Sequence, residues 1–360
     1  MKYLFVVQGD GRGHMTQAIA LSDILRRNGH EVVEVLVGKS KVREIPDFFY
    51  EKIGAKVRLF DTMSFVFKKD KKRISLLKSI FYNVTPRRLR KYNKSIEKIH
   101  RRIKKVQPDV VVNFYEILMG LTNLRFSLDV PVVNIGHQFL LRHPAYAHGK
   151  GEEQGMMFLR LHALLSGAGA TKTLALSFYP LKDYIPERIA VVPPLLRNEV
   201  LKLTPEKGDY ILGYMLNQGY ETEVRQWHEK NPDVLLHFFW DKKDAAEEQI
   251  IDKTMSLHTI DDEKFLNFMS GCGGYITTAG FESVCEALYL DKAVMMIPVH
   301  VEQEVNAADA ASFGGGIIGN NFDISVLLNY MEMRKYSNAA FREWVDSAEE
   351  AFVRHLTTLV

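Results

Sequence analysis

Apolar and polar positions alternate in blocks along this chain, as they do in proteins whose strands are separated by amphipathic helices. Between the first two apolar blocks, Ala18, Leu21 and Leu25 recur at helical spacing, and Asn28-Gly29 ends that helix. The first half has six predicted strands: Tyr3–Val7, Glu31–Val37, Lys56–Phe60, Asp109–Phe114, Val130–Ile135 and Lys172–Leu176. Strands of this apolar character that alternate with helices predict a parallel α/β sheet.

The same pattern starts again after an interruption near the middle of the chain. Pro193-Pro194 follows one apolar block, and a polar stretch separates it from the next. The second set of predicted strands comprises Tyr210–Tyr214, Val234–Phe239, Gly274–Thr277, Ala293–Ile297 and Gly316–Ile318, and Ala339–Leu359 is predicted to be helical. We therefore predict two Rossmann-like α/β domains, 1–197 and 209–335, with a linker at 198–208 and a terminal helix at 336–360. Two such domains with parallel sheets would face each other across a cleft, where ligands commonly bind.

Composition agrees with an ordinary globular protein of two domains. The chain has 360 residues, of which 46% are hydrophobic and 25% charged. Its two cysteines, Cys272 and Cys285, are too few for a disulfide framework, which favours a reducing compartment. The first apolar run is too short for a signal peptide, and no run reaches the ~18 apolar residues of a membrane span. A cytoplasmic protein is expected.

Three glycines at alternate positions, Gly9, Gly11 and Gly13, follow the first predicted strand and precede His14. The dinucleotide-binding fingerprint needs a third glycine where His14 stands, and an acidic residue at the end of the second strand. That strand ends instead in Gly38-Lys39-Ser40. The sequence therefore argues against a nicotinamide-dinucleotide site.

The glycine loop would place His14 at a helix N-terminus that faces the cleft. The helix dipole lowers the pKa of a histidine there and keeps the imidazole neutral near pH 7, as a general base requires. The alternative is a capping or surface histidine, which is the commoner role for a lone histidine. Motifs in the second half of the chain favour the general-base role over the capping role.

A second loop between strand and helix lies in the segment YITTAGFESVCEALYLDKAVMMIPVHVEQEVNA (275–307). Gly280 allows close approach of a ligand to the N-terminus of the following helix, which can receive an anion. Ser283 can donate a hydrogen bond, and the carboxylate of Glu286 can accept from both hydroxyls of a ribose. The next loop carries Glu302-Gln303, a carboxylate beside an amide, which suits sugar hydroxyls. The order phosphate, ribose and hexose is that of a nucleotide-sugar.

This second loop resembles the donor-binding motif of UDP-glycosyltransferases with the two-Rossmann-domain (GT-B) fold. The resemblance rests on Gly280 to Pro298, Glu302-Gln303 and Asn306-Ala307. The spacing is also similar to that of the bacterial enzyme that adds N-acetylglucosamine to lipid-linked peptidoglycan precursors. The opening GDGRGHMTQAIALSDILRRNGHEV resembles the family's first loop and helix, and NIGHQF (134–139) loosely resembles its acceptor-side segment.

The resemblance implies a hexosyltransferase whose first domain binds the acceptor and whose second binds the nucleotide-sugar, with the last helix packing back on the first. It implies that Glu286 binds the ribose, that the Gly280 loop binds the diphosphate, and that His14 is the catalytic base or an acceptor-side polar group. The implied donor-site residues are Asn217, Gln218, Gly219, Thr278, Gly280, Phe281, Ser283, Glu286, Glu302, Gln303 and Asn306. The implied acceptor-side residues are Gly11, Gly13, His137 and Gln138.

One departure from the family bears on the chemistry. Plant members carry a phosphate-binding histidine at the position of Thr278, and retaining relatives carry a glutamate there. The absence of the glutamate therefore favours inverting transfer, and the absence of the histidine removes one charge-assisted contact to the phosphate. No Asp-x-Asp pair stands out, and the fold class generally works without a catalytic metal. We therefore expect no metal and no cofactor beyond the UDP-sugar as co-substrate.

The segment 68–105 is strongly basic, with 16 Lys and Arg against Asp70 and Glu97. Apolar residues such as Leu76 and Phe81 lie among these charges, so the segment could dock on anionic lipid headgroups. A solvated helix face and nucleic-acid binding are the alternatives, of which we do not expect the latter. A peripheral position on the inner face of the membrane would suit a lipid-linked or cell-envelope acceptor.

Two other functions remain open at this stage. A UDP-sugar epimerase on the same fold would need further acid and base carboxylates, which the sequence does not identify. A non-catalytic protein that binds sugar nucleotides would keep the Glu286 site and tolerate loss of His14.

Overall fold

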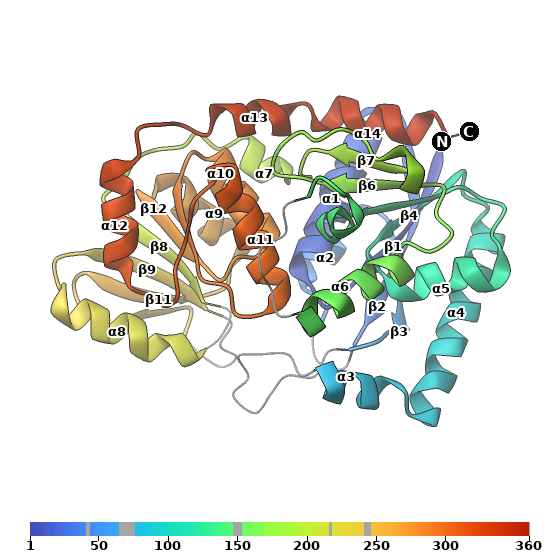
Figure 1. The fold of residues 1–360 in the computed structure, drawn as a ribbon, viewed down its shortest axis with the longest axis horizontal. Helices are drawn as coiled ribbons and strands as arrows, with labels where there is room; N and C mark the ends of the chain where they lie inside the picture. Colours follow the sequence, from blue (N-terminus) through green and yellow to red (C-terminus); the bar gives the residue numbers. More distant parts are fainter. Residues whose placement is uncertain (41–43, 65–75, 147–152, 216–217, 241–245, 360) are drawn as a thin grey trace.

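Two seven-stranded sheets lie beside each other, one from each half of the chain (Figure 1). The computed structural model describes residues 1–40, 44–64, 76–146, 153–215, 218–240 and 246–359. The predicted α/β class with two Rossmann-like sheets is confirmed. The domain limits given above stay a prediction.

The first sheet is wholly parallel and has the strand order β3-β2-β1-β4-β5-β6-β7. Its strands are β1 (Lys2–Gln8), β2 (Glu31–Lys39), β3 (Lys56–Asp61), β4 (Val110–Phe114), β5 (Val132–Gly136), β6 (Lys172–Leu176) and β7 (Ile189–Val192). Its helices are α1 (Arg12–Arg27), α2 (Asp47–Lys52), α3 (Leu76–Asn83), α4 (Pro86–Val106), α5 (Ile117–Phe126) and α6 (Glu153–Ser166), with a 3₁₀ helix at His137–Arg142. The carboxyl ends of β1, β4 and β5 thus precede His14, Tyr115 and His137, so these residues gather at one edge of the sheet.

The second sheet has the order β10-β11-β9-β8-β12-β13-β14, and all its pairs are parallel except β10 with β11. Its strands are β8 (Tyr210–Met215), β9 (Leu235–Trp240), β10 (Glu248–Ile250), β11 (Met255–Thr259), β12 (Gly274–Thr277), β13 (Ala293–Met296) and β14 (Ile317–Ile318). Its helices are α8 (Glu221–Lys230), α9 (Asp262–Gly271), α10 (Phe281–Tyr289), α11 (Val301–Ser312) and α12 (Ile324–Met333). The α10 start matches the helix expected near Phe281.

Strands β10 and β11 were not predicted, for a reason that their side chains make plain. In β11, Ser256 and His258 are buried polar residues that interrupt the apolar pattern. Their burial is tolerated because they hydrogen-bond each other at 2.9 Å, and the Ser256 hydroxyl also contacts His237 on β9 at 2.7 Å. The residues of β10 are exposed, so no apolar signal marks that edge strand.

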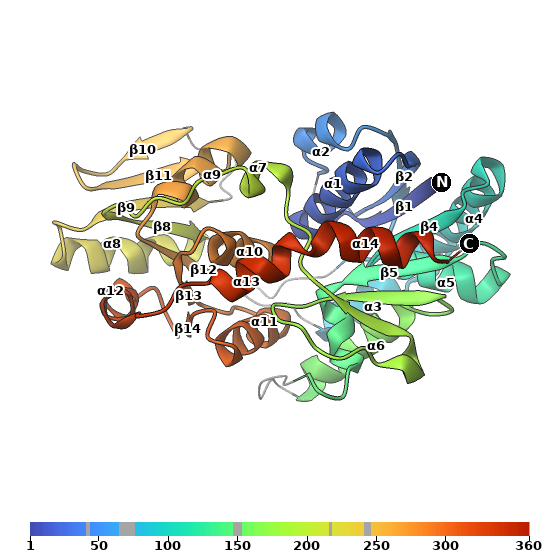
Figure 2. The same ribbon diagram turned by 90° about the horizontal axis from the view of Figure 1, so that it is seen from above.

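The C-terminal segment crosses from the second sheet to the first, as Figure 2 shows. The single helix predicted there is two helices, α13 (Ala339–Asp346) and α14 (Ala348–Thr357), separated at Ser347. In α14, Phe352 is fully buried, and Glu349 forms an ion pair of 2.7 Å with Arg27 at the end of α1. The chain therefore begins in the first half and returns to it.

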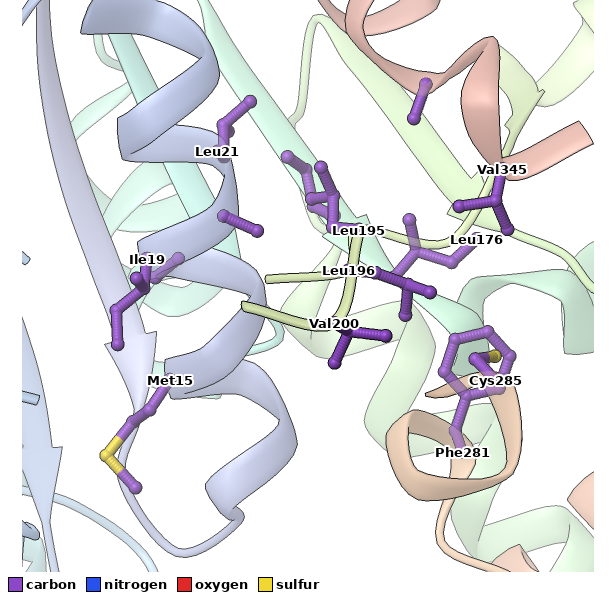
Figure 3. Packing of buried hydrophobic residues seen from close by; sticks show 14 of the residues in the cluster. Met15, Ile19, Leu21, Leu176, Leu195, Leu196, Val200, Phe281, Cys285 and Val345 are labelled. Atoms are coloured by element: carbon purple, nitrogen blue, oxygen red, sulfur yellow. The ribbon is translucent and has the colours of Figure 1, made fainter. Parts of the chain in front are cut away.

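The connection between the halves is part of the core. Leu195 and Val200, the latter in the short helix α7 (Asn198–Leu201), are 0% exposed. Figure 3 shows them between Ile19 of α1 and Phe281 of α10. Complete burial of a leucine or valine side chain stabilises a fold by roughly 1.5–3 kcal/mol, so this connection fixes the two halves against each other. The sequence had suggested a polar linker, which holds only for its second part.

Candidate active site

His14 lies in the first turn of α1, buried where the two halves meet. Its side chain is 8% exposed, and its Nδ1 is 3.3 Å from Oε1 of Gln17. The ring stacks on Tyr115, which follows β4, with 5.6 Å between ring centroids. Burial lowers the pKa of His14 and outweighs the opposing effects of the Glu302 carboxylate and of Gln17. The imidazole is therefore neutral near pH 7, in the direction expected from the sequence, but mainly because it is desolvated.

Gln17 connects His14 to the opposite half of the molecule. Its Nε2 donates a 2.5 Å hydrogen bond to Oε1 of Glu282 in the first turn of α10. Burial raises the pKa of Glu282 to about 8. Neither Gln17 nor Glu282 was singled out from the sequence, because no local motif marks a contact between residues 265 positions apart.

Glu302, a predicted sugar ligand at the start of α11, faces the acceptor-side residues of the first half. Its Oε1 accepts a 2.7 Å hydrogen bond from Nε2 of the predicted Gln138. Its charge also favours the protonated forms of His14 and His162, opposing the larger effect of burial on both. The ring centroid of His162, from α6, lies 4.8 Å from that of Tyr115. His162 was not predicted from the sequence as a site residue. Histidines that surround one carboxylate can perform acid–base chemistry.

His137 is buried in the same interface and contacts both halves. Its Nδ1 donates to the carbonyl of Leu176 at 2.8 Å, which leaves Nε2 as an acceptor, 3.2 Å from the Tyr146 hydroxyl. Burial lowers the pKa of His137 to about 4. Its ring stacks on Phe281 at a centroid distance of 4.1 Å. The side chain of Phe281, predicted for the donor loop, thus covers a predicted acceptor-side residue.

Glu286, the predicted ribose ligand, is buried in an ion pair. Its two carboxylate oxygens lie 2.6 and 3.2 Å from guanidinium nitrogens of Arg197, which also binds Asp262 of α9. Burial alone would lower the pKa of Arg197, but the carboxylates of Glu286 and Asp262 outweigh this effect and raise the pKa. If Glu286 binds a ribose, the ribose hydroxyls must share the carboxylate oxygens with Arg197 or displace the Arg197 guanidinium from them. Arg197 follows the Pro193-Pro194 pair, and no motif in the sequence marked it.

The donor loop is held by its own predicted residues. Asn306 Nδ2 donates to the carbonyl of Ala279 at 3.3 Å, and Ser283 Oγ donates to the carbonyl of Gly280 at 3.3 Å. Gln303 Oε1 accepts from the Val299 amide at 3.0 Å. Within the described part of the chain, no side chain caps α10, so its first amides remain suited to an anion.

The remaining predicted site residues have simpler positions. Thr278 is buried directly after β12, and Gly11 caps α1 in an extended conformation. A Cβ on Gly13 would lie 2.9 Å from Cγ of Glu282, so this glycine permits the close approach of the halves. Gln218 and Gly219 lie in a 3₁₀ turn after β8, and Asn217 lies outside the described residues.

The described residues also bear on metal ions and on membranes. No group of three or more His, Cys, Asp or Glu side chains in that part of the chain is arranged to hold a metal ion. Among the described helices, none is both long and apolar enough to cross a bilayer.

The chain matches a known family over most of its length, and solved structures share its fold. The profile of the family described as glycosyl transferase family 1 matches residues 1–333. The spinosyn rhamnosyltransferase SpnG complexed with thymidine diphosphate has 14% identity and a TM-score of 0.62, with 99% of this chain and 100% of that chain covered.

Two other solved structures are similar to the same extent. The glycosyltransferase SnogD from Streptomyces nogalater has 17% identity and a TM-score of 0.60 over 100% of this chain and 99% of that one. The glycotransferase of kitacinnamycin has 15% identity and a TM-score of 0.65 over 96% and 95%. No curated protein sequence matches significantly.

Proposed function

Because this chain belongs to glycosyl transferase family 1 and is a glycosyltransferase of the GT-B fold, we propose that it transfers a sugar from a UDP-sugar to an acceptor hydroxyl, with inversion and without a metal. The observation that carries the proposal is His14, a buried neutral imidazole linked through Gln17 to the first turn of α10. A base and a donor-binding helix are thereby two hydrogen bonds apart.

In the proposed reaction, the acceptor hydroxyl loses its proton to Nε2 of His14. The hydroxyl oxygen attacks the anomeric carbon in line, and the bond from that carbon to the diphosphate oxygen breaks. The electron pair leaves with the UDP. The uncapped amides at the start of α10 stabilise the negative charge that develops on the diphosphate. One displacement of this kind inverts the anomeric configuration.

The donor assignment rests on the second half of the chain. We propose that the diphosphate binds at Gly280 and Ser283, that the transferred sugar contacts Glu302 and Gln303, and that Glu286 receives the ribose. The competing donor is a dTDP-sugar, because SpnG is complexed with thymidine diphosphate. Glu286 favours the UDP-sugar, since a carboxylate assigned to both ribose hydroxyls would lose one of its two partners on the 2′-deoxyribose of dTDP.

A thermal-shift panel of UDP-, dTDP- and GDP-sugars tests the donor. A ligand at 100 times its Kd stabilises the folded state by about 2.7 kcal/mol, so a UDP-sugar should give the largest rise in Tm. Glu286→Gln should reduce that rise, whereas Glu332→Gln, an exposed glutamate on α12, should leave it unchanged. An equal response of Glu286→Gln and the parent protein would contradict the ribose assignment. Acceptor-dependent release of UDP then separates a transferase from a binding protein or an epimerase.

The acceptor is proposed to be borne by a lipid or another component of the cell envelope. Helix α4 buries Tyr92, Ile96 and Ile99 and leaves Arg87 and Arg90 exposed. The exposed apolar side chains Phe81, Val84 and Leu89 lie close to these arginines in the sequence. Cations beside exposed apolar groups suit a surface of anionic lipid. Of the basic segment 68–105, residues 68–75 lie outside the described residues.

A further inference from the structure

A chain of two hydrogen bonds crosses the interface and ends on the proposed base. Gln17 Oε1 faces Nδ1 of His14 at 3.3 Å, and Gln17 Nε2 donates to Oε1 of Glu282 at 2.5 Å. Gln17 is 3% exposed, so its amide cannot exchange these partners for water at low cost. His14 and Gln17 belong to α1, whereas Glu282 belongs to α10.

The chemistry of these groups determines where the proton of His14 lies. When Glu282 is ionised, its carboxylate only accepts hydrogen bonds, so it holds the NH₂ end of the Gln17 amide. The carbonyl end must then face His14, and a carbonyl oxygen also only accepts. Nδ1 of His14 therefore carries the proton, and Nε2 keeps the lone pair with which a general base removes a proton.

We propose that Glu282, acting through Gln17, is a positioning residue that fixes the tautomer and orientation of His14, so that the base forms only when the two halves are in contact. This inference rests on the proposed function insofar as it calls His14 the base. The tautomer itself is independent of any donor or acceptor.

Two features of the interface support this role. Gly13 has no Cβ, which would otherwise lie 2.9 Å from Cγ of Glu282 and push the two helices apart. The other carboxylate oxygen of Glu282, Oε2, is buried and has no hydrogen-bond partner among the described residues. Glu282 is therefore held against Gln17 by one hydrogen bond and is not shared with a wider network.

The protonation state of Glu282 gives a second signature. Burial raises its pKa to about 8. A protonated carboxyl can donate as well as accept, which releases the constraint on the Gln17 amide, so the base should become fully oriented only as Glu282 ionises. The charged or titratable groups that face Glu282 are Glu286 and Cys285 on α10, Arg197 on the connection between the halves, and His14 beyond Gln17.

The test exchanges the two side chains. In Glu282→Gln, the new amide can donate to Gln17 Oε1, which allows Gln17 to turn its NH₂ towards His14; kcat should fall at least about tenfold with little change in donor KM. Gln17→Glu places two carboxylates against each other and should also lower kcat. In the double variant Gln17→Glu/Glu282→Gln, the new glutamate accepts from His14 Nδ1 and from the new glutamine, so kcat should recover. Glu304→Gln, an exposed glutamate on α11, is the matched control.

The tautomer is measured separately by long-range ¹H–¹⁵N NMR of histidine-labelled protein, with His14 assigned from His14→Gln. Above about pH 9, where Glu282 is ionised, the parent and the double variant should have the proton on Nδ1, and Glu282→Gln should have a mixed signal. The rising limb of kcat against pH near pH 8 should be absent from Glu282→Gln. An unchanged tautomer and kcat in Glu282→Gln would overturn the inference. An altered tautomer in a protein that transfers no sugar would instead contradict the proposed function.

Discussion

At the scale of single residues, His14 shows which parts of the site a sequence can predict. The glycines before it and the helix after it are neighbours in the chain, so a local pattern was enough to predict its position at a helix start. The residues that define its environment are remote in sequence: Tyr115 stacks on its ring, and Glu282 reaches it through Gln17. Interactions of this kind arise only when the halves pack, and no spacing rule predicts them.

Replacing His14 by alanine tests its role directly. A positioned general base contributes ~10²–10⁴ to the rate, so His14→Ala should lower kcat at least about 100-fold. Donor binding should be nearly unchanged, because His14 is assigned to the acceptor side. His30→Ala, in the turn after α1, is the matched control. Weaker donor binding with a normal kcat would contradict the assignment.

Glu286 marks the limit of reasoning from a motif. The motif placed a carboxylate on α10 but carried no information on Arg197, which is 89 residues away and binds both of its oxygens. Removing one partner of a buried ion pair leaves an uncompensated charge and costs about 3–5 kcal/mol. The Glu286→Gln variant in the donor panel must therefore be shown to fold before its affinity is interpreted.

At the scale of elements, apolar runs predicted most of the parallel strands, but they missed β10, which is exposed, and β11, where polar residues interrupt the run. Residues Tyr3–Val7 of β1 form a continuous buried apolar run, and β4 keeps four apolar residues despite its buried Asn113. In β11, by contrast, Ser256 and His258 interrupt the run at alternate positions. Helix α4 is the opposite case, since its start at Pro86 and its buried stripe agree with its sequence. The exposed face of α4 carries the positive charges of Arg87 and Arg90, and its proposed membrane contact can be tested separately from the catalytic site.

Charge reversal on α4 tests whether that face docks on a membrane. The Arg87→Glu/Arg90→Glu variant should lose flotation with vesicles of phosphatidylglycerol and phosphatidylcholine by at least about tenfold, since each basic residue at an anionic surface contributes about 1 kcal/mol. Lys230→Glu/Lys253→Glu, on exposed positions of the second half, makes the same change in net charge and should float normally. Equal recovery of the parent protein with and without anionic lipid at low salt would remove the membrane proposal.

At the scale of the whole molecule, the two halves are held together by buried polar contacts as well as by apolar packing. Asp309 of α11 is fully buried and accepts a 3.1 Å hydrogen bond from the Tyr179 hydroxyl. Its second oxygen lies 3.6 Å from Nε2 of His137. Burial raises the pKa of Asp309 to about 7, so at neutral pH the contact between the halves includes a carboxyl close to its midpoint.

The pH dependence of stability follows from this pKa. Between the unfolded value of 3.8 and about 7, the folded protein keeps the Asp309 proton that the unfolded chain has lost. Asp309 therefore stabilises the fold most below pH 3.8. Its contribution declines by about 1.4 kcal/mol per pH unit between pH 3.8 and about 7, and it is constant at higher pH. Glu282, with its pKa raised to about 8, has the same sign. His137, with its pKa lowered to about 4, has the opposite sign, so it destabilises the fold as pH falls below 6.5.

Asp309→Asn separates the aspartate from these other groups, because the amide keeps the shape and the acceptor oxygen but cannot ionise. The variant should gain stability relative to the parent as pH rises from about 4 to 7, and the difference in Tm should then stay constant to pH 9. Asp233→Asn, an exposed aspartate, should give no such slope. A difference in Tm that is the same at every pH would mean that the aspartate does not change its protonation between the folded and unfolded states, which would contradict the raised pKa of Asp309.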